Sequence, residues 1–580
     1  RAALWKLWLP AVLKTDLLLD YTERMILVPN MKKIATAAVS AIMAVSMLCS
    51  SAFADQPYEG YSYDWWGDPV PSQNGYIVDQ IYTGMDMGAG ALTEPSDMFF
   101  SDNNDLFIAD TSYKAAGATD SMKGRIVVTD SDFNLKFTVE SLDFSGVQSW
   151  YNEKTAELES GMITQADYNK YTNTSFNGPT GVFVDTDEGV DTIYVADNAN
   201  DRVVQFAVEE INDDERKTAV GKVQMIFTRP ASNMYDSSIT FNPDKVLIDA
   251  AKNVYICIKS ITKGAVVYSK EGDFNGYFGA NRVEATGEVL MNAFWKLIFS
   301  REQAKRMRRS VPVEISNFDI DEDNFIYTVT ESKTVTTDVL KKLNSAGTNI
   351  FTNLGYSDYT FGDSLTKYYR NKTYTSQITD VDIGENGVIN LLDVATGRVF
   401  QYDDECQLLF IFGGIGQQKG TFTTPNAVES LGDKIYVLDG RKASVTVFKQ
   451  TEFGAIVHNA ISLFNKGKYE EARQPWEEAL RRDSNYWLAY IGLGNAYLNE
   501  GDYDTAMKYF YYNSKTGYND AFKSWRMNFI RDNFTLFAVI IILLIIAIYV
   551  ISSIKNKRRI KRRAEQERLF KEKNKGREDV

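Results

Sequence analysis

The feature that most constrains the fold of this chain is a short strand-turn-strand phrase that occurs more than once. Residues 191–206 read DTIYVADNANDRVVQF, and residues 433–448 read DKIYVLDGRKASVTVF, with seven identical residues at matching positions. Apolar and polar residues alternate on both sides of a turn at Asp-Asn or Asp-Gly, a pattern typical of two antiparallel strands joined by a tight turn. A hairpin repeated so far apart indicates an array of small sheets.

Related hairpins occur throughout the middle of the chain. Each follows a short apolar strand, and four of these strands open at proline. A further strand, such as residues 408–414, completes a four-stranded sheet. Small sheets that cannot bury both faces alone are stabilised by stacking around an axis. We therefore predict an all-β six-bladed propeller over residues 75–450, in which residues 75–84 close the ring as the outer strand of the last blade. The hairpins span residues 104–139, 191–206, 252–279, 323–351, 386–414 and 433–448.

The second unit carries a specific motif, P-x-G-V-x-V-D followed by I-Y-V-A-D and N-D-R-V-V-Q-F. This motif resembles the NHL repeat family, although the third and fourth units lack its aspartate and arginine. Because an aspartate that ends a strand before a tight turn usually caps the backbone of that turn, we interpret the recurring aspartates and arginines as structural. The motif residues of the second unit are Pro179, Gly181, Asp185, Asp197, Asn200, Arg202 and Phe206, and the recurring residues are Asp110, Asp197, Arg202, Asp393, Arg398 and Asp439.

Two insertions lengthen the propeller, and both have helical patterns. The first covers residues 145–171 and the second covers residues 293–312. The second is basic on an acidic protein, so it is either a solvated helix that covers a blade or a docking site for an anionic partner. Its basic residues are Lys305, Arg306, Arg308 and Arg309.

After Phe448 the hydrophobic period changes from 2 to 3.6, which predicts helices over residues 453–530. Residues 465–480 and 499–514 repeat a pattern at a spacing of 34 residues, and residues 518–534 suit a capping helix. The matches resemble two tetratricopeptide (TPR) repeats. Pro475 departs from this pattern, and we expect the second helix to kink there or to start late. The matched pairs are Gly467 with Gly501, Tyr469 with Tyr503 and Ala472 with Ala506.

Two apolar segments define the predicted topology. Residues 31–54 read as a secretory signal cut after Ala54, and the preceding residues 1–30 read as an over-extended gene start. Residues 533–554 contain no charge and are long enough to cross a bilayer as a helix. Residues 555–580 hold 12 Lys/Arg against 5 Asp/Glu, and such a basic flank stays cytoplasmic. We therefore expect a single-pass protein of the cell membrane with residues 55 to about 530 outside.

The residue inventory limits the chemistry. The net charge is −14 and the tail is basic, so the remainder is strongly acidic and nucleic acid is not an expected partner. His458 is the only histidine, and Cys257 and Cys406 lie in separate repeats, where we expect free thiols. We predict no metal and no cofactor. Carboxylates remain as candidate catalytic groups, and a resemblance to regucalcin-like lactonases implies a metal-dependent hydrolase as the alternative function.

The segment 55–74 holds an aromatic cluster that includes Trp65 and Trp66 beside Tyr61 and Tyr63. Such side chains either stack on sugars or proline-rich peptides or pack this segment onto the propeller. Propellers and TPR helices both present large surfaces to partners, so we expect a binding or scaffold protein for protein or carbohydrate partners in a membrane transport complex. This step rests on analogy of fold. A sugar-sensing receptor is a further alternative.

Overall fold

A computed structural model shows the arrangement of the chain, and it describes 57–58, 60–63, 68–113, 123–212, 217–236, 238–281, 313–331, 338–351, 361–363, 367–369, 372–374, 376–511 and 514–578. Several predictions lie outside these residues, namely those on the segments 1–30 and 31–54, on Trp65 and Trp66, and on the insertion 293–312 with Lys305, Arg306, Arg308 and Arg309.

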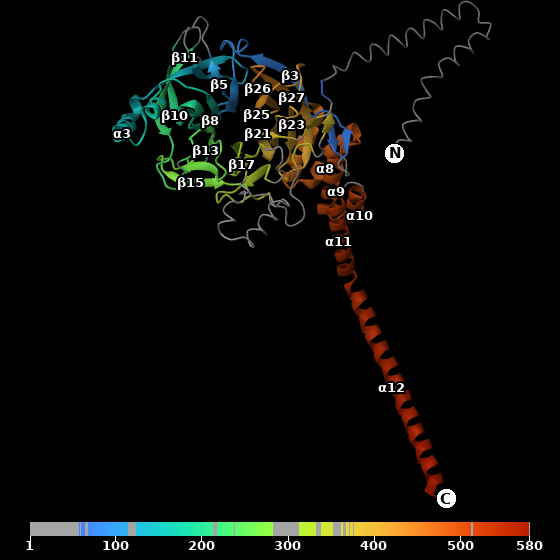
Figure 1. Cartoon of the computed structure of the whole chain (residues 1–580). Coiled ribbons are helices and arrows are strands. Elements are labelled where there is room, and N and C mark those ends of the chain that lie inside the picture. The colour runs from blue at the N-terminus through green and yellow to red at the C-terminus, as the bar shows by residue number, and fades with distance from the viewer. Residues whose placement is uncertain are drawn as a thin grey trace, which may run out of the picture. The chain divides into compact units, whose positions relative to one another are not determined.

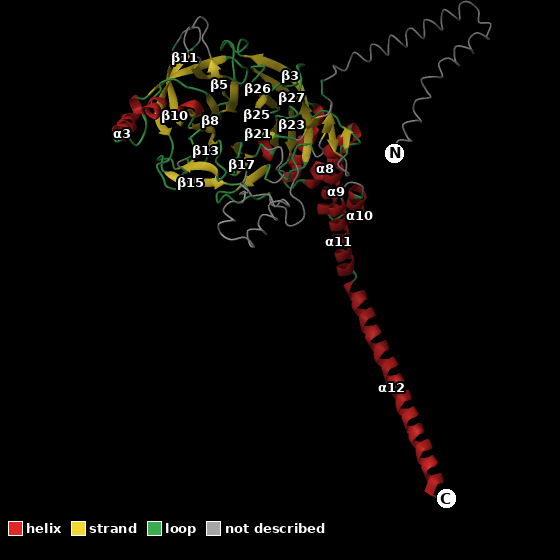
Figure 2. Cartoon of the chain, viewed as in Figure 1, coloured by secondary structure: helices red, strands yellow, loops and turns green. Residues whose placement is uncertain are grey.

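The middle of the chain forms antiparallel sheets of consecutive strands (Figures 1 and 2). Proline is the first residue of β4, β8, β12 and β25, where a strand does not need its missing N–H. The sheets consist of β4 (Pro95–Phe100), β5 (Leu106–Tyr113), β6 (Lys123–Thr129) and β7 (Leu135–Asp143); β8 (Pro179–Asp187), β9 (Val190–Asp197), β10 (Arg202–Ile211) and β11 (Thr218–Phe227); β12 (Pro243–Ile248), β13 (Val254–Ile258), β14 (Gly264–Tyr268) and β15 (Phe274–Gly279); β16 (Asn317–Ile320), β17 (Ile326–Val329) and β18 (Leu340–Leu343); β21 (Ile378–Ile383), β22 (Ile389–Asp393), β23 (Arg398–Tyr402) and β24 (Leu408–Gly413); and β25 (Pro425–Leu431), β26 (Lys434–Asp439), β27 (Ser444–Gln450) and β3 (Tyr76–Thr83).

The first strands of the sheets contact one another in a cycle that runs β4, β8, β12, β16, β21, β25 and back to β4. This cycle makes the fold a β-propeller. The prediction that residues 75–84 close the ring is confirmed, because β3 pairs with β27 and Tyr76 lies opposite Gln450. Two short pairs lie outside the cycle, β1 (Tyr61–Tyr63) with β2 (Pro69–Pro71) and β19 (Lys367–Tyr369) with β20 (Lys372–Tyr374).

The sheets differ from the expected set of separate four-stranded units in two places. The outer strands β7 and β11 pair in parallel, so the first two units join into one eight-stranded sheet. β7 and β11 are nine and ten residues long, and they pair between residues 138–143 and 218–222. The sheet that begins with β16 has three strands in the part of the chain that the structure describes.

Helices fill the first predicted insertion. The turn η1 (Ser145–Val147) leads into α3 (Gln148–Glu159), and α4 (Gln165–Tyr171) follows. Thr164 caps α4 because its side chain accepts a hydrogen bond from the backbone of Asp167, whose carboxylate in turn accepts from the Thr164 N–H. Two further 3₁₀ turns are η2 (Asn198–Asn200) and η3 (Glu385–Gly387).

The chain after β27 is helical, and each helix contacts the next. Gly492 of α9 lets Trp476 of α8 approach, because a Cβ at Gly492 would lie 2.4 Å from the indole ring. The structure contradicts the late start expected at Pro475, since α8 begins six residues earlier and contains this proline. The helices are α7 (Glu452–Asn465), α8 (Tyr469–Arg482), α9 (Trp487–Glu500), α10 (Tyr503–Phe510), α11 (Lys515–Asp532) and α12 (Phe534–Glu578).

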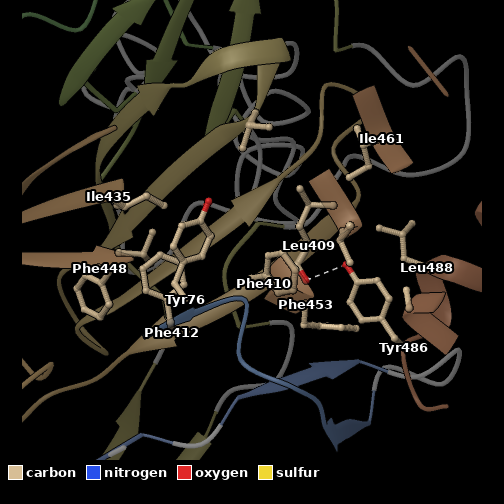
Figure 3. Close-up of a cluster of buried hydrophobic side chains, with 14 of the residues drawn as sticks. Tyr76, Leu409, Phe410, Phe412, Ile435, Phe448, Phe453, Ile461, Tyr486 and Leu488 are labelled. Atoms are coloured by element: carbon tan, nitrogen blue, oxygen red, sulfur yellow. Dashed lines mark hydrogen bonds between the residues drawn. The ribbon is translucent and has the colours of Figure 1, made fainter. Parts of the chain in front are cut away.

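The last two sheets and the helices share one hydrophobic core (Figure 3). Phe410 of β24 stacks on His458 of α7 and on Tyr486, which precedes α9. The Tyr486 hydroxyl donates a hydrogen bond of 3.1 Å to the carbonyl of Leu409. The start of α7 is fixed in the same place, since Thr451 donates through its hydroxyl to the carbonyl of Asn74 just before β3. The helices are therefore packed on the propeller and share its interior.

Helix α12 is the one described helix that is long and apolar enough to cross a membrane, by its length and composition. Its residues 534–572 contain an 18-residue window of mean hydropathy 3.2, and none of that window is buried within the protein. Residues 573–578 continue the helix, which begins two residues after α11 ends. This exposed apolar surface suits a membrane anchor.

Candidate functional site

The four recurring aspartates are fully buried and accept hydrogen bonds from the backbone. Asp439 accepts from the N–H groups of Thr423 and Thr424, which precede its sheet, and from the turn that follows it. Asp393 accepts from Gln377 N and from the turn that follows it, and Asp110 and Asp197 hold the corresponding segments of their sheets. Their hydrogen-bonding capacity is therefore used within the fold.

Arginines complete this arrangement in only some sheets. Arg202 pairs with Asp197 at 2.8 Å, and both side chains are fully buried. Arg125 pairs with Asp110 at 3.1 Å in the same manner, although the sequence pattern did not single it out. Arg398 differs, because it contacts Asp363 at 2.7 Å while Asp393 binds Thr396.

Part of the aromatic segment packs on the sheet that contains β24. Tyr61 and Tyr63 of β1 both donate through their hydroxyls to Asp363. The Arg398 guanidinium lies 5.1 Å from the centre of the Tyr61 ring. These two tyrosines therefore hold the segment onto the propeller, in line with the packing alternative.

A cavity of about 700 Å³, here called the central acidic cavity, lies among the ends of first strands from several sheets. Its lining comes from the β4, β16, β21 and β25 regions and from the end of α7. Nine carboxylates line it against two lysines, Lys342 and Lys466. Carboxylates concentrated in a concave site attract positively charged groups.

The first strands also place carboxylates between neighbouring sheets. Asp97 accepts from the N–H of Val182, and Asp380 accepts from Val428 at 2.6 Å. In the wall of the central acidic cavity, Asp319 accepts from Ile383 N and Asp382 accepts from Ser430 N. These strands lie at the inner edge of their sheets, so the carboxylates satisfy backbone N–H groups that have no strand partner.

Burial and mutual repulsion shape the electrostatics of these groups. Burial raises the pKa of Asp319 and of Glu429 well above the ordinary range, and neighbouring carboxylates raise both further. Burial also raises the pKa of Asp380 to about 7, against the opposing charge of Lys245. Lys245 itself forms an ion pair with Asp97. A cation that entered the cavity would favour the ionised carboxylates.

A buried chain of hydrogen bonds connects this cavity to the helices. The Asp382 carboxylate accepts a hydrogen bond of 2.7 Å from the side chain of Asn390, which in turn accepts one of 2.9 Å from the side chain of Gln401. The side-chain oxygen Oε1 of Gln401 lies 2.8 Å from Nε2 of His458. Burial lowers the pKa of His458 to about 4, so the imidazole is neutral near pH 7. The single histidine therefore lies at the junction of α7 and the propeller.

The described residues offer few candidates for a metal site or for a nucleophile. In the described residues, no group of three or more His, Cys, Asp or Glu side chains is placed to hold a metal ion. Cys257 and Cys406 are free thiols, as predicted. Burial raises the pKa of both thiols, which disfavours the nucleophilic thiolate.

The acidic residues of the first strands were not singled out from the sequence. Their signal was present as aspartates at alternate positions inside apolar strands, as in ITDVDIGE at residues 378–385. Alternation predicts only that such residues share one face of a strand. That this face borders a cavity depends on the closed cycle of sheets. The residues are Asp97, Asp319, Asp380, Asp382 and Glu429.

No protein-family model matches the chain, and no curated protein matches its sequence. Similar solved structures include virginiamycin B lyase from Staphylococcus aureus, with 9% identity, a TM-score of 0.33, and coverage of 65% of this chain and 100% of that one. The PQQ-bound aldose sugar dehydrogenase from Streptomyces coelicolor has 10% identity, a TM-score of 0.35, and coverage of 65% and 99%. PorZ, a surface component of the type-IX secretion system of Porphyromonas gingivalis, has 12% identity, a TM-score of 0.32, and coverage of 66% and 48%. Likeness at this level carries no functional argument.

Proposed function

We propose that this protein is a membrane-anchored binding protein that presents its propeller and helices outside the cell. In this proposal the sheets form six NHL-like blades, α7 to α10 are TPR-type helices, and residues 555–580 lie in the cytoplasm. The partner is a protein at the cell surface or in the membrane, within a transport complex, with carbohydrate as the alternative ligand.

The observation that carries the proposal is the core shared by the last two sheets and the helices. Because Phe410, Tyr486 and their neighbours exclude water from this junction, the helices keep the propeller close to the start of α12. A chain of this kind holds a large binding surface near a membrane. The exposed apolar surface of α12 supports the anchor.

The flanks of α12 support the orientation. On the N-terminal side, Phe522, Trp525 and Phe529 stack along one face of α11, with ring centres 5.7–5.8 Å apart. Aromatic residues gather at the boundary between membrane and water. On the C-terminal side, a basic run begins at Lys555, as expected for the cytoplasmic flank.

Crosslinking in intact cells tests the binding role. The full chain, carrying a C-terminal affinity tag, is crosslinked, extracted in detergent and examined by mass spectrometry. We expect one or more membrane or surface proteins to be enriched over a control chain that retains only residues 515–580. Equal recovery from both chains would contradict the proposal.

The hydrolase alternative is tested on the same purified protein. Lactone hydrolysis is measured with added calcium, zinc or manganese. We expect no turnover above the metal ion alone. Metal-dependent turnover that is lost in Asp319→Asn or Asp382→Asn, with the fold intact, would make the enzyme the leading interpretation.

A further inference from the structure

A second cavity, here called the seam cavity, lies where the helices meet the propeller. It has a volume of about 550 Å³. Its lining comes from the turn between β23 and β24, from Tyr63 of β1, and from α7, α8, α9 and the start of α11. A volume of this size accommodates a few residues of a peptide or a small organic molecule.

The seam cavity is lined by aromatic rings and by carboxylates, without a basic side chain among the described lining residues. Trp476, Trp487 and Phe464 supply the apolar surface, and Asp403 and Glu405 supply carboxylates from the turn. Lysine, arginine and histidine are absent from the described residues that line it. A cavity lined by both aromatic rings and carboxylates suits a positively charged group on an aliphatic stem.

The two carboxylates differ in what holds them. Asp403 accepts from the N–H groups of Glu405 and Gln407, so it fixes the turn and is only 8% exposed. No hydrogen bond to the Glu405 carboxylate occurs within the described residues. Burial raises the pKa of Glu405, and the nearby charge of Asp404 raises it further. The turn therefore keeps acidic groups close together, and the described residues that line the cavity beside them include no basic side chain.

An unsatisfied donor gives a second, independent indication of a ligand. Trp476 is 3% exposed, and its indole N–H has no acceptor in the described part of the chain. The edge that carries Nε1 lies against Gly492, and both residues line the cavity. A buried donor without a partner is unfavourable by the cost of its desolvation. A carbonyl group that entered beside Gly492 would accept this hydrogen bond.

We propose that the seam cavity binds an extended segment of a partner protein through one lysine or arginine side chain. The cationic head would contact Glu405 and Asp403, its aliphatic stem would lie between the tryptophans, and a backbone carbonyl of the segment would accept from Trp476. The carbonyl requirement favours a peptide over a free amine. The inference rests on the proposed binding function, for which it names the chemistry of the partner.

The test uses the full chain in detergent micelles and three probes. The first is the peptide acetyl-Gly-Ala-Lys-Ala-Gly-amide, the second has norleucine in place of lysine, and the third is 1,5-diaminopentane. Binding is followed by tryptophan fluorescence and calorimetry. Glu405→Gln removes the charge without changing the shape of the side chain, and Glu477→Gln makes the same change on the exposed side of α8. Trp476→Phe removes the indole N–H, and its melting temperature shows whether the helices remain folded.

We expect the lysine peptide to bind, the norleucine peptide and the diamine to bind at least tenfold more weakly, and Glu405→Gln to weaken the lysine peptide by roughly tenfold. Glu477→Gln should bind as the parent does, and a folded Trp476→Phe should bind more weakly. Equal binding of the norleucine peptide, or an unchanged affinity in Glu405→Gln, would overturn the site. Equal binding of the diamine would overturn the peptide as its ligand. Because this assay does not depend on topology or on a cellular partner, it can fail while the crosslinking experiment succeeds, and the reverse also holds.

Discussion

At the scale of single residues, two of the buried aspartates of this propeller have different energetic roles. Asp197 neutralises Arg202, which has no exposed surface, whereas Asp439 accepts only backbone N–H groups. Removing one partner of a buried ion pair leaves a charge without compensation and costs about 3–5 kcal/mol. Losing hydrogen bonds to backbone donors costs about 1–3 kcal/mol.

Asp197→Asn should therefore lower the free energy of unfolding more than Asp439→Asn does. We expect a difference of about 2 kcal/mol between the two variants. Guanidinium unfolding of the detergent-solubilised chain, followed by tryptophan fluorescence, measures it. An equal decrease of the unfolding free energy in both variants would show that the ion pair of Asp197 with Arg202 contributes no more to stability than the backbone hydrogen bonds of Asp439.

The contribution of Asp380 to stability should fall as pH rises, because burial raises the pKa of this carboxyl to about 7. The folded state binds this proton more tightly than the unfolded state, so the contribution is complete below about pH 4 and is lost as pH rises through about 7. A shift of this size corresponds to at most about 4 kcal/mol. The pKa of Asp403, raised to about 8 by burial, acts in the same direction.

We expect the urea midpoint to decrease less between pH 5 and pH 8.5 in Asp380→Asn than in the parent. Asp323→Asn, at an exposed position, serves as the control and should follow the parent. Identical pH profiles for Asp380→Asn and the parent would mean that Asp380 is ionised in the folded protein at pH 5.

Sequence patterns reached some of these residues and missed others for a physical reason. Asp197 and Arg202 are five positions apart on adjoining strands, so their pairing is visible in the sequence. Asp110 and Arg125 make the same contact across fifteen positions, because an insertion separates β5 from β6. The contact depends on strand register, which the insertion conceals.

At the scale of elements, closure of the propeller rests on β3, which comes from the opposite end of the propeller sequence. Tyr76 of β3 is 3% exposed and contacts Phe412 of the neighbouring sheet, with ring centres 4.9 Å apart. Deleting residues 75–84 would expose the edge of β27 and remove this ring from the core.

We expect the deletion variant to melt well below the parent or to fail to fold. The control replaces Ile77 and Gln80 of the same strand with alanine, since both side chains are exposed and the backbone pairing remains. The control should melt within a few degrees of the parent. Closure by β3 would be refuted if the deletion melted at the parent's temperature, as measured by circular dichroism.

Helices and strands with a strong hydrophobic period were predictable from the sequence. The pairing between strands of different repeats was not. The change of period after Phe448 predicted helices, and α8 and α10 begin within residues 465–480 and 499–514, the two segments related by the spacing of 34 residues. The parallel pairing of β7 with β11 could not be read from the sequence, because it joins strands from different repeats through the backbone. Helix α8 contains Pro475, so of the two alternatives predicted there, a kink or a late start, the late start is wrong.

At the scale of the whole molecule, the order of the parts was predictable but the sites between them were not. The central acidic cavity and the seam cavity are both lined by segments that are far apart in sequence, such as Asp382 with Ser462 and Glu405 with Trp476. Composition predicted an acidic protein and a basic tail. The acidic groups and the helices line the same cavities because α7 packs against the last two sheets.

The proposed function depends on α12 anchoring the chain with the propeller outside, and protease accessibility tests this topology most directly. A chain with an epitope tag after Val580 is expressed, and intact cells are treated with a protease that cannot cross the cytoplasmic membrane. With this topology, we expect residues 57–511 to be digested while a tagged fragment containing α12 stays protected until the membrane is permeabilised. Loss of the tag in intact cells with survival of the propeller would contradict it.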